Sequence, residues 1–302
     1  MKTAVALFIF KRIDTTARII ETLRNIKPTR VYLIADGPRS NIENEQTQCL
    51  KTRQTIEKEI DWECQILTKY SETNLGGPTN IINGISWVFE HEDQAIFLED
   101  DDLPSESFFY FCENMLDKYK DNFNIKIVTS GDKDMGVAKK HKDSYFFDKH
   151  ILSILGFALW KSRWNQFDFQ MNDWPTLKNN GKIKELFTSK KRYEILSNEW
   201  DNLFNKSNQS WDYFLLYNFY RSSGSCIIPT TNLVENIGIR PDATRTTTNN
   251  PLIKSAKRSE LNFPLTHPKK IVSNEKSDLS LHRRKHGIKA KLGKALIKLK
   301  LV

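Results

Sequence analysis

Short apolar runs alternate with longer amphipathic stretches along the first 120 residues of the chain. Four of the short runs indicate strands buried within a sheet: residues 4–10, 31–35, 64–67 and 95–98. Four longer stretches predict helices: residues 14–24, 42–60, 80–90 and 104–120. This alternation is typical of βαβ units, so the sequence predicts an α/β fold with a mostly parallel sheet flanked by helices.

The pattern changes after the first part of the chain. Beyond residue 132 the strict alternation fades and aromatic residues become dense, which indicates a second lobe over residues 133–250. Residues 251–280 are polar, rich in lysine and punctuated by proline, and predict a linker. The chain is therefore expected to comprise a first lobe (1–132), a second lobe (133–250), this linker and a tail (281–302).

Charge is concentrated at the end of the chain. The net charge of +9 includes eight Lys or Arg residues within 281–302, where there is no acid, so the other 280 residues carry only +1. A basic surface spread over a folded domain would indicate nucleic-acid binding, whereas this distribution does not. We therefore expect no nucleic-acid partner.

The tail has the pattern of a basic amphipathic helix. Its apolar residues recur at helical spacing with lysines between them: Ile288, Leu292, Ala295, Leu296 and Leu299. Such helices bind anionic membrane surfaces, although a solvated helix or a disordered tail is the alternative. The four cysteines form no CxxC pair, and residues 4–10 are too short for a signal-peptide core. We expect a cytoplasmic protein, peripheral on the inner face of the cell membrane.

Four consecutive acids follow the apolar run at 95–98, namely Glu99, Asp100, Asp101 and Asp102. Ligands of open α/β sheets bind at the carboxyl ends of the strands, where these acids lie. Adjacent carboxylates repel one another unless a cation offsets their charge, and hard oxygen ligands favour Mn²⁺ or Mg²⁺. The alternative is a solvated acidic turn before a helix, where carboxylates are also favoured. The acids alone leave both interpretations open.

The segment around these acids, residues 96–112, reads IFLEDDDLPSESFFYFC. It resembles GT-A glycosyltransferases related to N-acetylglucosaminyltransferase I, including a bacterial branch that decorates surface polysaccharides. The resemblance implies a GT-A, Rossmann-like fold with a donor-binding lobe (1–132) and an aromatic-rich acceptor-binding lobe (133–250). It also implies that Glu99 and Asp100 hold the ribose and uridine of the donor and that Asp101 binds the metal. Asp102 is an additional acid and a second candidate ligand.

Further matches follow in the order of the family. Arg12 resembles the family's strand-end arginine near the nucleotide, Asp36 the carboxylate that reads the uracil edge, and Asn74 the N-x-G loop. Gly156, in the run LGFALW, is similar to a loop and helix that flank the donor phosphates. Arg245 stands where relatives carry histidine and would meet the diphosphate as a bidentate cation. Each position also has an ordinary structural explanation, such as an Asx turn at Asp36.

Asp212, in Ser210-Trp211-Asp212, lies at the family's position for an acid aimed at the acceptor. An inverting transferase needs one base to take the proton of the attacking hydroxyl, and Asp212 is our candidate. The alternative is an ordinary helix start, with Ser210 as the N-cap and Asp212 in the first turn. Glu235 and Asp242 are the reserve candidates for the base.

Together these features predict a metal-dependent, inverting glycosyltransferase of hexosyl or N-acetylhexosaminyl type. Its expected donor is a nucleotide-diphosphate sugar, with UDP favoured, and its acceptor is a hydroxyl of a glycan or lipid-linked saccharide. One alternative is a sugar nucleotidyltransferase, although these usually open with a glycine-rich phosphate loop and FIFKRIDTT contains no glycine. Another is a non-enzymatic module that binds membranes or nucleic acid through the basic tail.

Overall fold

The computed structural model describes residues 1–131, 137–138, 141–207, 210–239, 256–274 and 277–280. The first half contains β1 (Ala4–Ile9), α1 (Ile13–Ile26), β2 (Arg30–Ala35), α2 (Glu45–Glu59), β3 (Gln65–Tyr70), α3 (Gly77–His91), β4 (Gln94–Glu99), β5 (Asp102–Pro104), α4 (Glu106–Tyr119) and β6 (Ile125–Thr129). The second half contains β7 (Tyr145–Asp148), β8 (Phe157–Trp160), α5 (Lys161–Trp164), α6 (Trp174–Asn179), the 3₁₀ turn η2 (Lys184–Leu186), α7 (Lys190–Phe204), α8 (Trp211–Arg221), β9 (Ser225–Pro229), β10 (Val234–Asn236) and β11 (Ser273–Asn274).

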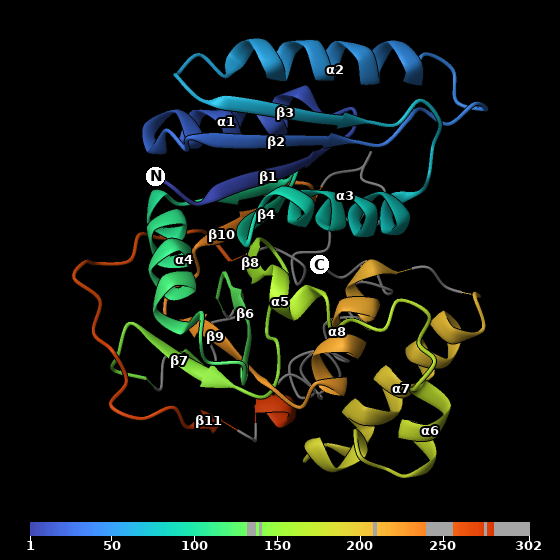
Figure 1. Ribbon diagram of the computed structural model, residues 1–302, viewed down its shortest axis with the longest axis vertical. Helices are drawn as coiled ribbons and strands as arrows, with labels where there is room; N and C mark the ends of the chain where they lie inside the picture. Colours follow the sequence, from blue (N-terminus) through green and yellow to red (C-terminus); the bar gives the residue numbers. More distant parts are fainter. Residues whose placement is uncertain (132–136, 139–140, 208–209, 240–255, 275–276, 281–302) are drawn as a thin grey trace, which may run out of the picture.

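The described residues form a nine-stranded sheet of order β11-β7-β9-β6-β8-β4-β1-β2-β3. Strands β3, β2, β1 and β4 are parallel, and β8 is antiparallel to both of its neighbours, β4 and β6. Figure 1 shows β1 to β4 in the upper part of the molecule and α6, α7 and α8 grouped at the lower right. The predicted α/β class, with a mostly parallel sheet flanked by helices, is confirmed.

Each face of the sheet carries its own hydrophobic core. Successive strand residues point to opposite faces, so Ala6 and Phe8 of β1 join one core and Leu7 and Ile9 join the other. Helices α1, α2 and α4 cover the second core, while α3 and α5 to α8 cover the first. Because the central strands are buried on both sides, their sequences are apolar without alternation, as the pattern of residues 95–98 indicated.

One local prediction was wrong. The run after Gly156, which we predicted as a loop and helix, is strand β8, followed by the short helix α5. Phe157 and Leu159 enter one core while Ala158 and Trp160 enter the other. A strand buried on both faces is apolar throughout, so its sequence cannot be distinguished from a packed helix by periodicity.

Residues 256–274, which fall within the predicted linker, contact residues of both predicted lobes. The carboxylate of Glu260 accepts hydrogen bonds from the backbone N–H groups of Glu106 and Ser107 at the start of α4, at 3.2 and 2.9 Å. Strand β11 pairs with β7 at the edge of the sheet. These contacts show that the described part of the predicted linker is packed against the fold. The division of the chain into two lobes stays a prediction. The tail at 281–302 lies outside the described residues, and no described helix is long and apolar enough to cross a membrane.

Candidate functional site

A large cleft opens at the carboxyl edge of the parallel strands. It contains about 3000 Å³ of empty space, part of it open to solvent. Because β1, β2 and β4 are parallel, the residues that follow them meet at this edge. The cleft is lined by eight of the predicted site residues: Arg12, Asp36, Asn74, Glu99, Asp100, Asp101, Asp102 and Asp212. Gly156 is not among the lining residues, and Arg245 lies outside the described part of the chain.

The centre of the cleft is an ion-paired cluster. One guanidinium nitrogen of Arg12 donates to Asp101 Oδ2 at 2.6 Å and to Asp100 Oδ1 at 3.1 Å. The three side chains are between 13% and 19% exposed, so the charges are partly desolvated and attract strongly. Arg12 follows β1, whereas the two acids follow β4, and the parallel pairing of these strands brings them together. Arg12 therefore fixes both carboxylates at the strand ends.

Asp102 differs from its neighbours because it is 2% exposed and faces the backbone. Its Oδ2 accepts hydrogen bonds from the N–H groups of Glu99 at 3.2 Å and Gly156 at 3.0 Å. Burial raises the pKa of Asp102 well above its ordinary value, and the charges of Asp101 and Glu99 raise this pKa further. These contacts give Asp102 and Gly156 a shared role in shaping the acidic turn. Asp101 is thus the better placed of the two candidate ligands.

Gly156 is suited to this turn by its backbone conformation. Its φ of +58° is one that residues with a Cβ rarely adopt, and a Cβ there would lie 2.9 Å from Leu98 Cδ2. The glycine thus allows β8 to begin directly beneath the acids, with its N–H on Asp102. A direct contact between Gly156 and the donor stays a prediction.

Asp36, at the end of β2, organises the loop that follows β3. Its Oδ1 accepts from the N–H groups of Gly37 at 2.9 Å and Leu75 at 2.7 Å, and its Oδ2 accepts from Asn74 Nδ2 at 3.1 Å. The same Asn74 amide also donates to the Gly37 carbonyl at 2.7 Å. Asp36 and Asn74 therefore form a single unit on the wall of the cleft, and their roles toward the nucleotide stay predictions.

Glu45, which is fully buried in the first turn of α2, was not among the residues predicted from the sequence. Its carboxylate accepts from Lys11 Nζ at 2.7 Å and from the backbone N and Nε of Arg39 at 2.8 and 2.9 Å. These bonds, chiefly those from Arg39, lower the pKa of Glu45 to about 2. Both cations line the cleft, so Glu45 holds two positive charges at its wall.

The opposite wall comes from α7, α8 and the residues that follow β7. Trp211, Asp212, Tyr213 and Leu216 of α8 and Arg192 of α7 line it. Most of the aromatic residues in this lobe pack into the core instead, among them the largest fully buried side chains: Trp174, Trp200, Tyr217 and Tyr220. The aromatic lining of the cleft is therefore narrower than the sequence suggested.

Of the two reserve candidates for the base, Glu235 is the one within the described residues. Glu235 lies in β10, opposite Leu103 of β5, and forms an ion pair of 2.6 Å with Lys257. It is not among the residues that line the cleft. Asp242 lies outside the described residues. Of the three acids proposed as a base, Asp212 is the one that the described structure places in the cleft.

The residues present are compatible with a metal that arrives with its substrate. Among the described residues, no three His, Cys, Asp or Glu side chains converge as a ligand set. Mg²⁺-type ions are commonly held by one or two carboxylates together with substrate phosphates, and keep several waters. Asp101, in the cleft and 19% exposed, can supply that carboxylate, while Arg12 offsets the charge of the neighbouring acids. The site thus fits a divalent ion bound mainly through a diphosphate.

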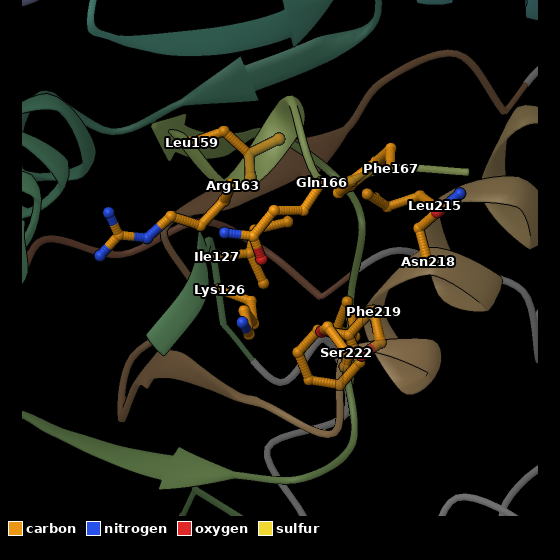
Figure 2. Close-up of a pocket in the computed structure, with 11 residues that line it drawn as sticks. Lys126, Ile127, Leu159, Arg163, Gln166, Phe167, Leu215, Asn218, Phe219 and Ser222 are labelled. Carbon is orange, nitrogen blue, oxygen red and sulfur yellow. Dashed lines mark hydrogen bonds between the residues drawn. The ribbon is translucent and has the colours of Figure 1, made fainter. Parts of the chain in front are cut away.

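A second hollow lies among β6, β8 and α8 and is far smaller, with about 340 Å³ of empty space. Figure 2 shows the guanidinium of Arg163 pointing away from the other labelled side chains. This guanidinium donates to the carbonyls of Tyr119, Asn122 and Ile125, so its role is structural. No described carboxylate lines the hollow, and it therefore lacks the groups expected of a metal or acid–base site.

Comparisons with known proteins give distant likenesses. No family model and no curated protein matches the chain. A mannosyltransferase from Pyrobaculum calidifontis, solved with GDP-Man and Mn²⁺, is 8% identical over 52% of this chain and 44% of its own, with a TM-score of 0.36. TarS from S. aureus is 11% identical over 78% of this chain and 59% of its own, with a TM-score of 0.41.

A UDP-glucose pyrophosphorylase complexed with UDP-glucose is 9% identical over 57% of this chain and 82% of its own, with a TM-score of 0.34. The aligned region thus spans about half the length of the mannosyltransferase and TarS chains. Both glycosyl-transferring and nucleotide-sugar-forming enzymes resemble this chain, and at such low scores neither likeness assigns a function.

Proposed function

We propose that the protein is a glycosyltransferase that moves a sugar from a nucleotide-diphosphate donor, with UDP favoured, to a hydroxyl of a glycan or lipid-linked saccharide. The observation that carries the proposal is that one cleft joins the acidic strand ends to an acid on the opposite wall. The strand ends carry Arg12, Asp100 and Asp101, and the acid on the other wall is Asp212 of α8. This arrangement provides a place for an activated donor and a base for an acceptor.

On the donor side the chain supplies fixed charges. Asp101 offers a carboxylate to a divalent ion, and Arg12 positions that carboxylate through its 2.6 Å bond. When bound, Mn²⁺ or Mg²⁺ would stabilise the negative charge of the departing diphosphate. Asp36 and Asn74 would present a rigid polar wall to the nucleotide, and Glu99 and Asp100, which line the same cleft, would hold its ribose and uridine. The family resemblance of the sequence supports these assignments.

On the acceptor side, Asp212 takes the proton of the attacking hydroxyl. The bond from the acceptor oxygen to the anomeric carbon forms as the bond from that carbon to the diphosphate breaks. Attack from the face opposite the diphosphate inverts the anomeric centre. Tyr213, which follows Asp212 in α8 and also lines the cleft, is partly exposed and provides apolar ring surface against which a sugar can pack.

The reaction products distinguish a glycosyltransferase from the alternative, a sugar nucleotidyltransferase. With a panel of nucleotide sugars, Mn²⁺ and a saccharide mixture, a glycosyltransferase releases nucleoside diphosphate, and chelation of the metal stops the release. A nucleotidyltransferase instead forms nucleoside triphosphate when pyrophosphate is added. Formation of triphosphate, or release that is unchanged in Asp101→Asn, would refute the proposal. Asp61→Asn is the matched control because that acid is exposed and bonded to Arg24, away from the cleft.

We also propose that the basic tail holds the enzyme at an anionic membrane surface near a lipid-linked acceptor. Its eight cations support this, since each contributes about 1 kcal/mol near such a surface. Removal of residues 281–302 is expected to abolish binding to vesicles containing phosphatidylglycerol while leaving turnover of a soluble acceptor intact. Equal vesicle binding by the full and shortened chains would contradict a membrane role.

A further inference from the structure

The wall of the cleft that is formed by α7, α8 and residues 151–155 is named the acceptor wall, after the proposed function. It contains a buried cation that has no ion-pair partner among the described residues. Arg192, in the first turn of α7, is 7% exposed and lines the cleft. Among the described residues its guanidinium forms no ion pair, and its Nε has no hydrogen-bond acceptor. Removing a charge from water is costly unless a partner compensates for it. A ligand that carries negative charge would supply that compensation.

A second buried hydrogen-bond donor on the same wall also lacks a partner among the described residues. Trp211, 2% exposed, also lines the cleft, and its Nε1 has no acceptor among the described residues. Its ring is held against Phe157 at a centroid distance of 5.5 Å. Buried indole N–H groups usually find a hydrogen-bond partner. Two unsatisfied buried donors, from α7 and from α8, therefore face one cavity.

Two buried carboxylates of the same lobe, Asp278 and Asp148, accept hydrogen bonds from groups other than Arg192. Asp278 accepts from the backbone N–H groups of Ser189 at 2.6 Å and Leu279 at 2.9 Å. Asp148 accepts from the N–H of His150 at 2.7 Å and from Ser277 Oγ at 2.6 Å. Burial raises the pKa of the Tyr220 hydroxyl; the charge of Arg192 lowers this pKa, whereas the charges of Asp148 and Asp278 raise it. Among the described residues neither acid forms an ion pair with Arg192. The cation thus keeps its hydrogen-bonding capacity for the cleft.

The local sequence also favours an anion at this place. The first turn of α7 begins with Lys190, Lys191 and Arg192 and contains no acid. Helix N-termini favour negative charge, so three cations there run against the helix dipole. Features that violate a local rule without compensation occur mainly at functional sites. An anion bound at Arg192 would reverse this unfavourable balance.

We propose that Arg192 and Trp211 form a subsite for an oxyanion, a carboxylate or a phosphate, carried by the acceptor saccharide. The identification of the ligand as the acceptor saccharide rests on the proposed function, whereas the binding of an anion at this place does not. A guanidinium donates two parallel hydrogen bonds to either group, and the indole N–H adds a third donor. The apolar side chains of Ile151, Leu152 and Leu216, which also line the cleft, lower the local polarity and strengthen these bonds. The acceptor is therefore an acidic saccharide.

Binding of probes to the full chain tests the subsite without any turnover. Methyl glucuronide, glucose 6-phosphate and neutral methyl glucoside are titrated by calorimetry into the protein and into Arg192→Gln. We expect the acidic probes to bind better than the neutral one, and Arg192→Gln to weaken them by about 10- to 100-fold, as for a lost bond to a charged group. The stronger of the two acidic probes identifies the anion as carboxylate or phosphate.

Three variants separate recognition from support of the fold. Lys191→Gln removes an exposed charge from the same turn and should leave probe binding unchanged. Arg192→Lys should recover part of the affinity. Trp211→Phe, which keeps an aromatic ring but removes the N–H, should weaken the binding of the acidic probes but not of the neutral one. If Arg192→Gln lowers only the unfolding temperature, or if all probes bind both chains equally, the subsite does not exist.

The donor diphosphate is the other anion that could reach Arg192. Titration of UDP and GDP with Mn²⁺ decides between them, because an acceptor subsite predicts equal affinity in the parent chain and in Arg192→Gln. A matching loss of affinity for the nucleoside diphosphate would overturn the assignment to the acceptor. Acidic probes that bind as expected to a protein that turns over no donor would refute the transferase and leave the oxyanion subsite standing.

Discussion

The two walls of the cleft differ in how their charges are compensated. On the donor wall, Arg12 pairs with Asp100 and Asp101, while Glu45 holds Lys11 and Arg39. On the acceptor wall, Arg192 Nε and the indole Nε1 of Trp211 are buried and have no hydrogen-bond partner among the described residues. A wall that neutralises itself is pre-organised before substrate arrives, whereas a wall with unsatisfied donors depends on its ligand. The comparison predicts that the two walls will respond differently to mutation.

Asp212→Asn tests the acceptor wall and should have the largest effect. If Asp212 is the base, the amide cannot take the proton of the attacking hydroxyl, and kcat should fall by about 100- to 10,000-fold. Donor affinity should be unchanged, because the donor wall is built from other elements. Steady-state kinetics together with titration of UDP in the presence of Mn²⁺ measures both quantities.

One control accompanies this variant. Glu235→Gln changes a reserve candidate that is bonded to Lys257 and does not line the cleft, and it should leave kcat nearly unchanged. A large loss in Glu235→Gln, with Asp212→Asn fully active, would transfer the role of base to the β10 acid.

Asp101→Asn tests the donor wall. Loss of the carboxylate weakens the metal–diphosphate contact and removes the shorter of the two bonds that Arg12 makes to Asp101 and Asp100, so kcat/KM for the donor should fall on the order of 1000-fold. The Mn²⁺ concentration for half-maximal rate should rise as well. Asp102→Asn is expected to act differently: Asp102 is buried on the backbone, so its loss should lower stability more than metal affinity. Equal shifts in Mn²⁺ dependence for both variants would make Asp102 a metal ligand too.

Glu45→Gln tests whether the donor wall is pre-organised by its own ion pairs. The bonds from Arg39 and Lys11 hold the pKa of Glu45 at about 2, below the ordinary 4.5. A lowered pKa stabilises the fold fully above pH 4.5, and this contribution is lost as the pH falls through about 2. The variant should therefore be less stable by about 3 kcal/mol at pH 7, with the difference shrinking below pH 4.5.

Urea unfolding at a series of pH values measures this difference. Glu194→Gln, which changes an exposed glutamate on α7, is the control and should show no comparable dependence on pH. A difference between Glu45→Gln and the parent chain that stays constant from pH 7 to pH 3 would show that the ion pairs do not stabilise the wall.

The donor wall was largely predictable from the sequence. Arg12, Asp36 and Asp101 each follow an apolar strand, and parallel strands must bring such residues to one edge. Glu45 was missed because an acid in the first turn of a polar helix is common, and its partners Lys11 and Arg39 are paired through tertiary contact alone.

The acceptor wall was less accessible because its position depends on how helices pack. Trp200 and Trp211 look alike in the sequence and both pack into the core, yet Trp211 also lines the cleft and Trp200 does not. Arg192 could have been suspected from the three cations that open α7, since they oppose the helix dipole. Its burial and lack of a partner could not, because they arise from the packing of α7 against α8.

Gly238→Ala tests how closely the chain must approach the acidic cluster and should have the smallest effect of this series. A Cβ at Gly238 would lie 1.9 Å from Asp101 Oδ2 and 2.7 Å from Asp101 Cβ, so the carboxylate and its backbone must shift away from Arg12. Overpacking of this kind costs about 1–3 kcal/mol, and we expect donor kcat/KM to fall by about tenfold. Gly224→Ala is the matched control, since its Cβ would lie 2.2 Å from Lys126 Cγ, outside the cleft. That variant should lose stability but keep its affinity for the donor. If both alanines lower stability and neither alters donor kcat/KM, then the position of Asp101 is not critical, and the donor wall tolerates more movement than its ion pairs suggest.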